Sequence, residues 1–253
     1  MPSKAKINSA ADCQRLVEEI CASTKGVRLI SAEDVTIDES GELGSGSFCT
    51  VYPATVRRHD LEGAEVVARV INTDKCSEVL SECKVIVNIC DVTVTTFGLS
   101  YSELAAGHRV VILLEKCAGN LDDFLEEEGT SVCAKARVCL RVLRGLQALK
   151  GRHLVWRDLK GQNMLVKRII RNKSHGDVHD IEILLSDFGT AVYRPKSQKR
   201  RMTLYGPGTE GYIAPETRSP DYSHQVDMWA FLVWAAGLCL DAELAGGTGA
   251  LEE

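Results

Sequence analysis

The pattern of apolar residues changes near residue 117 from one typical of strands to one typical of helices. Before this point, β-branched residues recur in short runs, such as residues 65–71 and 109–114, with one helical segment expected at residues 77–88. After Gly119 the apolar spacing predicts a short helix at residues 121–128 and a long one at residues 131–150. A strand-rich part followed by a helix-rich part predicts an α+β fold.

Two of the expected helices have an apolar face that can be named from the sequence. The long helix is expected to turn six residues inward: Val132, Ala136, Cys139, Leu140, Leu143 and Leu146. An earlier short helix is expected within an extension formed by residues 1–34, because Ser9 and Asp12 are typical of a helix start and apolar residues then recur at Cys13, Leu16, Val17, Ile20 and Cys21. We expect the apolar face of this short helix to pack on the main domain. The alternative is that it binds a separate partner.

Composition narrows the class of protein. The chain has 253 residues, of which 45% are apolar and 26% charged, as is usual for a soluble globular protein. Its net charge of −5 gives no reason to expect nucleic acid or an anionic membrane as a partner. The ten cysteines lack paired short spacings and the N-terminus is polar, so we expect reduced thiols and a cytoplasmic location.

Three motifs follow one another in the helix-rich part. Residues 156–163 read Trp-Arg-Asp-Leu-Lys-Gly-Gln-Asn, residues 187–189 read Asp-Phe-Gly, and residues 208–216 read Gly-Thr-Glu-Gly-Tyr-Ile-Ala-Pro-Glu. In this order they resemble the catalytic loop, the magnesium loop and the substrate-side loop of a protein kinase. The resemblance implies a bilobal kinase-like fold, with a strand-rich N-lobe at residues 35–117 and a helical C-lobe at residues 118–253.

The resemblance also implies an activity and its residues. A protein kinase transfers the γ-phosphoryl group of ATP to protein hydroxyls with the help of Mg²⁺. Here Asp158 would act near the attacking hydroxyl, Lys160 would contact the γ-phosphate, and Asn163 and Asp187 would hold Mg²⁺. Lys160 and Thr209 resemble the serine/threonine kinases, and residues 33–37 resemble their tyrosine-kinase-like branch.

A glycine-containing segment supplies the expected nucleotide cradle. Residues 43–51 resemble the kinase glycine-rich loop, and the alternative is an ordinary hairpin turn. Cys49 stands where the family has its third glycine. The residues that the resemblance assigns to ATP are Leu43, Gly44, Ser45, Gly46, Ser47, Phe48, Val51, Arg69, Glu82, Glu115, Cys117 and Leu165.

The strand lysine that holds the phosphates in this family is missing. In one register Arg69 takes its place and pairs with Glu82, and in the other register Val70 takes it and the cation is lost. A guanidinium binds as a planar fork rather than as a compact point charge. We therefore expect reduced turnover, and the alternative function is a nucleotide-binding pseudokinase or scaffold.

Two supports of the catalytic loop can also be assigned. Trp156 replaces a histidine of the family, and we expect it to stack on Phe188 if its indole N–H finds an acceptor. By resemblance, Asp227 holds the loop backbone from a buried helix. Arg157 is expected to hold a phosphate on the segment that contains Ser197 and Thr203, amid a basic cluster at Lys196, Lys199, Arg200 and Arg201.

The end of the chain departs from the family pattern. Only 26 residues follow Asp227, and no Lys or Arg follows Arg218 to pair with Glu216. The chain resembles a kinase domain truncated before its final helices. We expect Glu216 to be exposed together with Trp229, Phe231, Val233 and Trp234. Three alternatives follow: a marginally stable monomer, a module whose regulatory partner covers this region, or an incomplete gene product.

Overall fold

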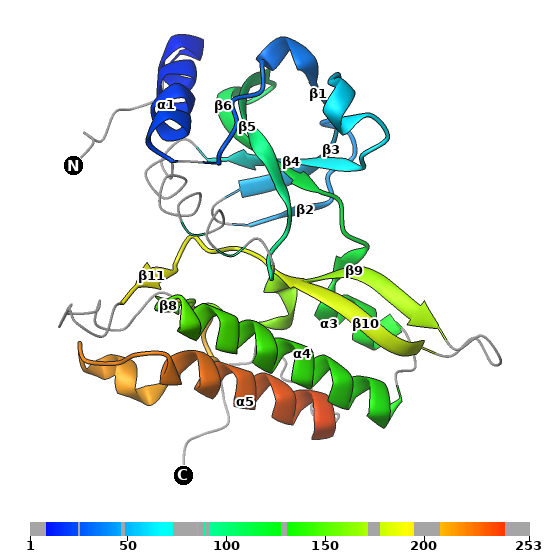
Figure 1. Ribbon diagram of the computed structural model, residues 1–253, viewed down its shortest axis with the longest axis vertical. Helices are drawn as coiled ribbons and strands as arrows, with labels where there is room; N and C mark the ends of the chain where they lie inside the picture. The colour runs from blue at the N-terminus through cyan, green and yellow to red at the C-terminus, as the bar shows by residue number, and fades with distance from the viewer. Residues whose placement is uncertain are drawn as a thin grey trace. The chain divides into compact units, whose positions relative to one another are not determined.

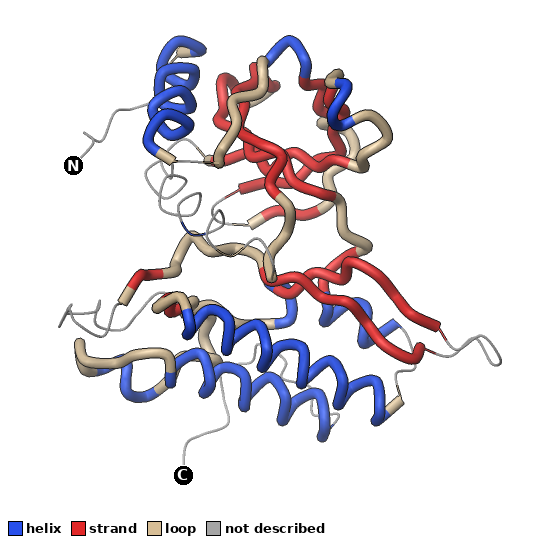
Figure 2. The backbone as a smooth tube through the Cα atoms, viewed as in Figure 1, coloured by secondary structure: helices blue, strands red, loops and turns tan. Residues whose placement is uncertain are grey.

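The computed structural model describes nine stretches of the chain: residues 9–24, 26–46, 49–72, 85, 89, 92–127, 131–171, 178–194 and 208–240. The chain divides into two compact units, residues 1–116 and 117–253. Strands dominate the first unit, and long helices are found in the second, as Figures 1 and 2 show. The predicted α+β fold is confirmed.

The first unit contains one antiparallel sheet. Its strands run in the order β1-β3-β4-β6-β5, with β2 beside β3. Their bounds are β1 Val35–Ile37, β2 Gly44–Ser45, β3 Cys49–Val56, β4 Val66–Ile71, β5 Thr96–Leu104 and β6 Gly107–Glu115, and two short 3₁₀ helices lie at Ala32–Asp34 and His59–Leu61. All six residues of β4 are buried, because this strand has a neighbour on each edge and packed side chains on both faces. Of the helix predicted at residues 77–88, only Val85 lies within the described residues.

Helix α1 (Ala10–Ser23) covers one face of this sheet (Figure 1). Ser9 caps the helix, since its hydroxyl oxygen accepts a hydrogen bond from the Asp12 backbone N–H at 3.2 Å. The helix residues Cys13, Val17 and Ile20 are almost fully buried in one cluster with Ile71, Leu99, Val110 and Ile112. The apolar stripe of α1 therefore packs on the chain's own sheet, as predicted.

The second unit combines helices with two small sheets. The helices are α3 Leu121–Glu127, α4 Val132–Gly151 and α5 Gln225–Leu240, with 3₁₀ turns at Gly161–Asn163 (η4) and Pro215–Arg218 (η5). One sheet has the order β10-β9-β7 and the other pairs β11 with β8. The strands are β7 Gly119–Asn120, β8 Leu154–Val155, β9 Met164–Arg171, β10 Val178–Leu185 and β11 Val192–Tyr193.

The predicted inner face of the long helix is wrong for most of its residues. In α4 the buried residues are Ala134, Val138, Val142, Gly145, Leu146 and Leu149. Val132 and Leu140 are 83% and 55% exposed, and Leu146 is the one predicted residue that is buried. The buried face is rotated toward small residues because α4 lies close against β10, where an added Cβ at Gly145 would stand 3.0 Å from Leu185.

Helix α5 lies beside α4 (Figure 1) and is apolar around most of its circumference. Trp229 is 42% exposed, as predicted, and Glu216 is exposed too. The same expectation is wrong for Phe231 and Trp234, which are 6% and 4% exposed because they lie on the packed side of the helix. Within the described residues, no helix is both long and apolar enough to cross a membrane.

Candidate functional site

The loop at residues 156–163 connects β8 to β9 and is held at its start by a buried carboxylate. Asp227, on α5, is 3% exposed. Its Oδ2 accepts a hydrogen bond from the Trp156 backbone N–H at 3.0 Å, and its Oδ1 accepts one from the Arg157 N–H at 2.7 Å. Burial raises the pKa of Asp227 to about 6, although these two N–H groups pull the pKa down. The predicted contact between Asp227 and the loop is confirmed.

Asp158, Lys160 and Asn163 lie together in this loop. The Asn163 Nδ2 group donates to the backbone oxygen and to Oδ2 of Asp158, each at 2.8 Å. The Lys160 Nζ lies 3.9 Å from Asp158 Oδ2. Thr209 Oγ1 donates to the other carboxylate oxygen, Oδ1, at 2.8 Å. Both oxygens of Asp158 are thus fixed by neighbours, which orients a carboxylate that lies partly open to solvent.

The contact of Thr209 was not assigned from the sequence. Its position in the third motif suggested the type of hydroxyl substrate, but no sequence signal placed its hydroxyl against Asp158. The two residues are 51 positions apart, and the second unit brings them together by tertiary folding.

The magnesium-loop motif lies directly against the catalytic loop. Trp156 and Phe188 are buried and stack with ring centroids 5.5 Å apart and planes 26° apart. The Trp156 indole N–H donates to the backbone oxygen of Asp187 at 3.0 Å. Both parts of the prediction for Trp156, the stack and the acceptor, are therefore confirmed. This bond also holds Asp187 at a positive φ of 54°, a conformation in which Asp is among the better tolerated residues.

We predict that Trp156→Phe will lower the free energy of unfolding by about 1 kcal/mol, because the ring stack remains while a partly buried hydrogen bond is lost. Urea unfolding of the two proteins measures the difference. Trp229→Phe, on the exposed side of α5, is the matched control and should change the value by less than about 0.5 kcal/mol. Equal effects of the two substitutions would contradict a special role for the indole N–H.

Two of these side chains offer oxygen atoms of the kind that Mg²⁺ prefers. Asp187 has a carboxylate, and the Asn163 amide directs its nitrogen to Asp158, which leaves its oxygen for another ligand. Ser186 donates from both its backbone N–H and its hydroxyl to the Asn163 backbone oxygen, each at 2.9 Å, and so ties the two segments together. The donor set therefore fits a magnesium ion.

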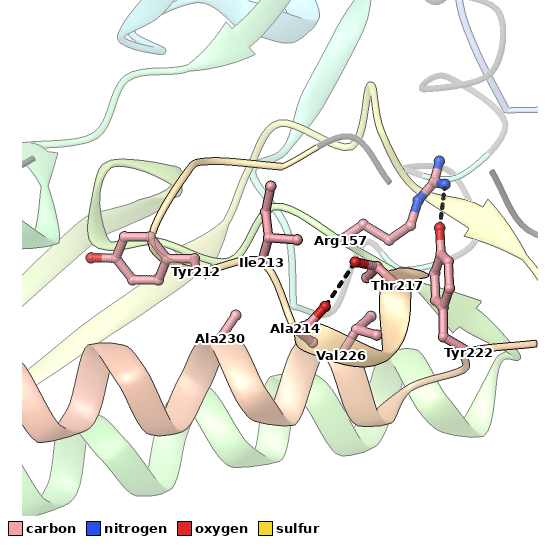
Figure 3. A pocket seen from close by; sticks show the side chains of 8 residues that line it. All are labelled: Arg157, Tyr212, Ile213, Ala214, Thr217, Tyr222, Val226 and Ala230. Carbon is pink, nitrogen blue, oxygen red and sulfur yellow. Dashed lines mark hydrogen bonds between the residues drawn. The ribbon is translucent and has the colours of Figure 1, made fainter. Parts of the chain in front are cut away.

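Arg157 is occupied by contacts within the second unit. Its backbone adopts a left-handed φ of 73°, and its Nε donates to the Thr190 backbone oxygen at 2.7 Å. Its Nη1 donates to the Tyr222 hydroxyl at 3.2 Å, at one end of the small pocket in Figure 3. The pocket is lined by Arg157, Tyr212, Ile213, Ala214, Thr217, Tyr222, Val226 and Ala230. Arg157 thereby joins the segment after the magnesium loop to the start of α5. Its role in holding a phosphate stays a prediction, because Ser197, Thr203 and the basic cluster at residues 196–201 lie outside the described residues.

The glycine-containing segment forms a hairpin in the first unit. Gly44 and Ser45 pair with Val51 and Thr50, and the Leu43 N–H donates to the Val51 oxygen at 2.8 Å. The Gly46 N–H donates to the Cys49 oxygen at 2.9 Å. A Cβ added at Gly44 or Gly46 would meet no atom within 4 Å, so a ligand can approach this backbone. Ser47 and Phe48, also predicted to bind ATP, lie outside the described residues.

Arg69 and Val70 point to opposite faces of β4. Arg69 is the Cα partner of Val51 and of Ile112, and side chains of directly paired residues share a face. Val70 belongs to the cluster on the other face, with Ala68 and Leu113. Arg69 is 7% exposed, and its Nε donates to the Cys49 sulfur at 3.0 Å. Its predicted partner Glu82 lies outside the described residues.

Of the last three predicted ATP residues, Glu115 belongs to the first unit and Cys117 and Leu165 to the second. Glu115 ends β6, and its Oε1 accepts hydrogen bonds at 2.7 Å from both the backbone N–H and the hydroxyl of Thr95. Cys117 is the first residue of the second unit and is half-buried. Leu165 is half-buried on β9, where it pairs with Asn120 and Leu184.

Comparison with known proteins assigns a family to this fold. Residues 37–248 match the model of the protein kinase domain. The chain is similar to Serine/threonine-protein kinase ATG1a of Arabidopsis thaliana, with 30% identity over 194 residues, which covers 74% of this chain and 29% of the relative. Serine/threonine-protein kinase 1 of Arabidopsis thaliana is 29% identical over 81% of this chain and 24% of its own length.

The chain is also similar to a serine/threonine-protein kinase from an animal. Serine/threonine-protein kinase 10 of Mus musculus is 29% identical over 204 residues, which covers 75% of this chain and 19% of the relative. The chain therefore matches less than a third of the length of each of these three curated relatives. Its two units form the bilobal α+β fold expected of the matched domain. The chain belongs to the protein kinase family.

Proposed function

We propose that this chain transfers the γ-phosphoryl group of ATP to serine or threonine hydroxyls of proteins, in the cytoplasm and with Mg²⁺. The observation that supports this most strongly is the arrangement around Asp158. Its carboxylate is oriented by Asn163 and Thr209, and Lys160 lies 3.9 Å away in the same loop. The names of the similar curated proteins, all serine/threonine-protein kinases, support the same hydroxyl class.

In the proposed mechanism Asp158 orients the substrate hydroxyl and accepts its proton as the new O–P bond forms, while the bond from the γ-phosphorus to the bridging oxygen breaks and ADP leaves. The hydrogen bonds from Asn163 and Thr209 hold the carboxylate in place before the substrate arrives. The Lys160 ammonium lies where it can offset negative charge on the transferred group. Asn163 and Asp187 would hold Mg²⁺, which when bound neutralises charge on the phosphates.

The proposal is tested by incubating the purified chain with Mg²⁺, radiolabelled ATP and a mixed peptide pool, followed by phosphoamino-acid analysis. We expect label on serine or threonine. Label confined to tyrosine would contradict the proposed substrate class. Nucleotide-dependent thermal stabilisation without any transfer would contradict the proposed activity and favour the alternative function, a nucleotide-binding pseudokinase or scaffold.

The environment of Arg69 is what favours that alternative. The buried Arg69 guanidinium, hydrogen-bonded to the Cys49 sulfur, lies on the same face of the sheet as Val51. At this position the family has the ammonium group of a lysine. Because the guanidinium is larger and forked, we propose that it places the phosphates less well than lysine and lowers turnover. The face shared with Val51 supports Arg69, rather than Val70, as the residue in the lysine position.

We predict that Arg69→Lys will raise kcat about tenfold, because a misplacement of about 1 Å can cost on the order of a hundredfold in rate. Steady-state transfer of label from ATP measures the change. Val70→Lys is the matched control, and it should lower stability without raising kcat, since it places an ammonium in the opposite apolar cluster. A higher kcat in Val70→Lys with no increase in Arg69→Lys would assign the lysine position to Val70 instead.

A partner that covers α5 stays a prediction. The helix exposes Met228, Trp229 and Leu232, which are 40%, 42% and 58% exposed. Exposed apolar side chains of this size are common where another surface binds.

A further inference from the structure

The catalytic loop is in close contact with an acidic side chain that the mechanism above does not use. Between Lys160 and Asn163 the loop turns through Gly161, in the 3₁₀ turn η4. A Cβ added at Gly161 would overlap Oδ1, Cγ and Oδ2 of Asp122. The carboxylate of Asp122, at the start of α3, therefore occupies the space that any larger residue at position 161 would need.

Two other elements border this carboxylate. The Trp234 indole N–H, on α5, donates to Asp122 Oδ1 at 3.1 Å. The Gln162 backbone N–H, within the loop itself, lies close enough to the carboxylate to lower its pKa. Burial raises the pKa of Asp122, and these two N–H groups oppose that rise. One side chain thus connects α3, the catalytic loop and α5.

The contact between Asp122 and Gly161 lies between two proposed functional residues. Lys160 precedes Gly161 directly, and Asn163 follows Gln162 directly. A shift of the turn would therefore move the proposed phosphate-contacting cation and the proposed magnesium ligand together. Exposed acids on the same helix, such as Glu126, lie further along α3 and do not accept the hydrogen bond from Trp234.

We propose that Asp122 is a positioning residue for phosphoryl transfer, which fixes the turn between Lys160 and Asn163 by filling the space over Gly161 while the Trp234 indole N–H holds its carboxylate in place. This inference rests on the proposed kinase function. It adds a residue that contacts neither nucleotide nor substrate and acts through the loop alone.

Single substitutions test the role in catalysis. Asp122→Ala should lower kcat at least tenfold and leave the KM for the peptide within about twofold, because the loop is loosened while the substrate surface is unchanged. Asp122→Asn keeps the size and one acceptor oxygen, so it should restore kcat to within about threefold of the wild type. Glu126→Ala removes the same charge from an exposed site and should leave kcat unchanged.

A double substitution tests the contact itself. The backbone of Gly161 does not adopt a positive φ, and the three atoms nearest to an added Cβ there all belong to Asp122. Gly161→Ala should slow transfer at least tenfold in the wild type and less than twofold in the Asp122→Ala background. Equal slowing in the two backgrounds would overturn the inference.

Hydrogen exchange at the Asn163 amide, which donates to the Lys160 backbone oxygen and closes the turn, separates this inference from the proposed function. Asp122→Ala and Gly161→Ala should each speed that exchange at least tenfold, and Glu126→Ala should not. Unchanged exchange in Asp122→Ala overturns the positioning role even if the wild type transfers phosphate. If the wild type transfers none, the proposed function fails and the exchange measurement still decides whether Asp122 fixes the loop.

Discussion

Replacing Asp187 with asparagine is expected to lower phosphoryl transfer at least about a hundredfold while leaving the fold intact. The loss follows because the proposed magnesium ligand changes from a carboxylate to a neutral amide, and removal of one group that stabilises developing charge typically costs about a hundredfold to a thousandfold. The fold should persist, since asparagine also tolerates the φ of 54° and keeps an oxygen for the Gly189 N–H, 3.4 Å from Oδ1.

Label transfer from ATP, measured together with the melting temperature, checks this expectation. Asp221→Asn makes the same chemical change at an exposed position and should alter neither quantity. If Asp187→Asn retains more than a tenth of wild-type transfer at an unchanged melting temperature, Asp187 does not hold the metal that the proposed mechanism requires.

Replacing Asp227 with asparagine is expected to lower transfer about tenfold to a hundredfold from a position that contacts no substrate. Each carboxylate oxygen of Asp227 accepts one backbone N–H, from Trp156 and from Arg157. Asparagine has only one such oxygen, so one N–H would face an amide N–H₂ group and the start of the catalytic loop would shift. Steady-state kinetics should show the loss in kcat.

The raised pKa of Asp227 adds a prediction about pH. Because its pKa is about 6 in the fold against an ordinary value of 3.8, folding favours the protonated carboxyl. Its contribution to stability is fully present below the ordinary pKa and is lost as pH rises to about 6, a difference of about 3 kcal/mol. Urea unfolding between pH 4 and 7 should show the wild type losing this much relative to Asp227→Asn, which does not titrate. Parallel stability curves for the two proteins would contradict the raised pKa.

The catalytic loop could be predicted from the sequence because its groups are close along the chain. Asp158, Lys160 and Asn163 lie within six positions, so any folded form of this segment keeps them near one another. The stack of Trp156 on Phe188 was predictable from the resemblance, since the family packs a histidine against the phenylalanine of the magnesium loop and a tryptophan ring can stack there as well. The acceptor for its indole N–H, the Asp187 backbone oxygen, follows from the observed fold.

Other features depend on tertiary packing that a pattern of apolar residues does not encode. In α4 the larger side chains Val132 and Leu140 face solvent, while Gly145 is buried against β10, where an added Cβ would stand 3.0 Å from the Leu185 side chain. Spacing alone predicted the helix but not which of its faces turns inward. Asp122 could not be identified for the same reason, because its contacts join α3, η4 and α5.

We claim that the Asp158 loop carries out phosphoryl transfer, and a time course of label incorporation by the wild type and by Asp158→Asn tests this. Asparagine preserves an acceptor oxygen and the side-chain size but cannot take up the hydroxyl proton. We expect wild-type incorporation into serine or threonine to rise in proportion to enzyme concentration. In Asp158→Asn the rate of incorporation should fall about a hundredfold or more while the melting temperature stays unchanged. No incorporation by the folded wild type, or equal incorporation by the two proteins, would contradict the claim.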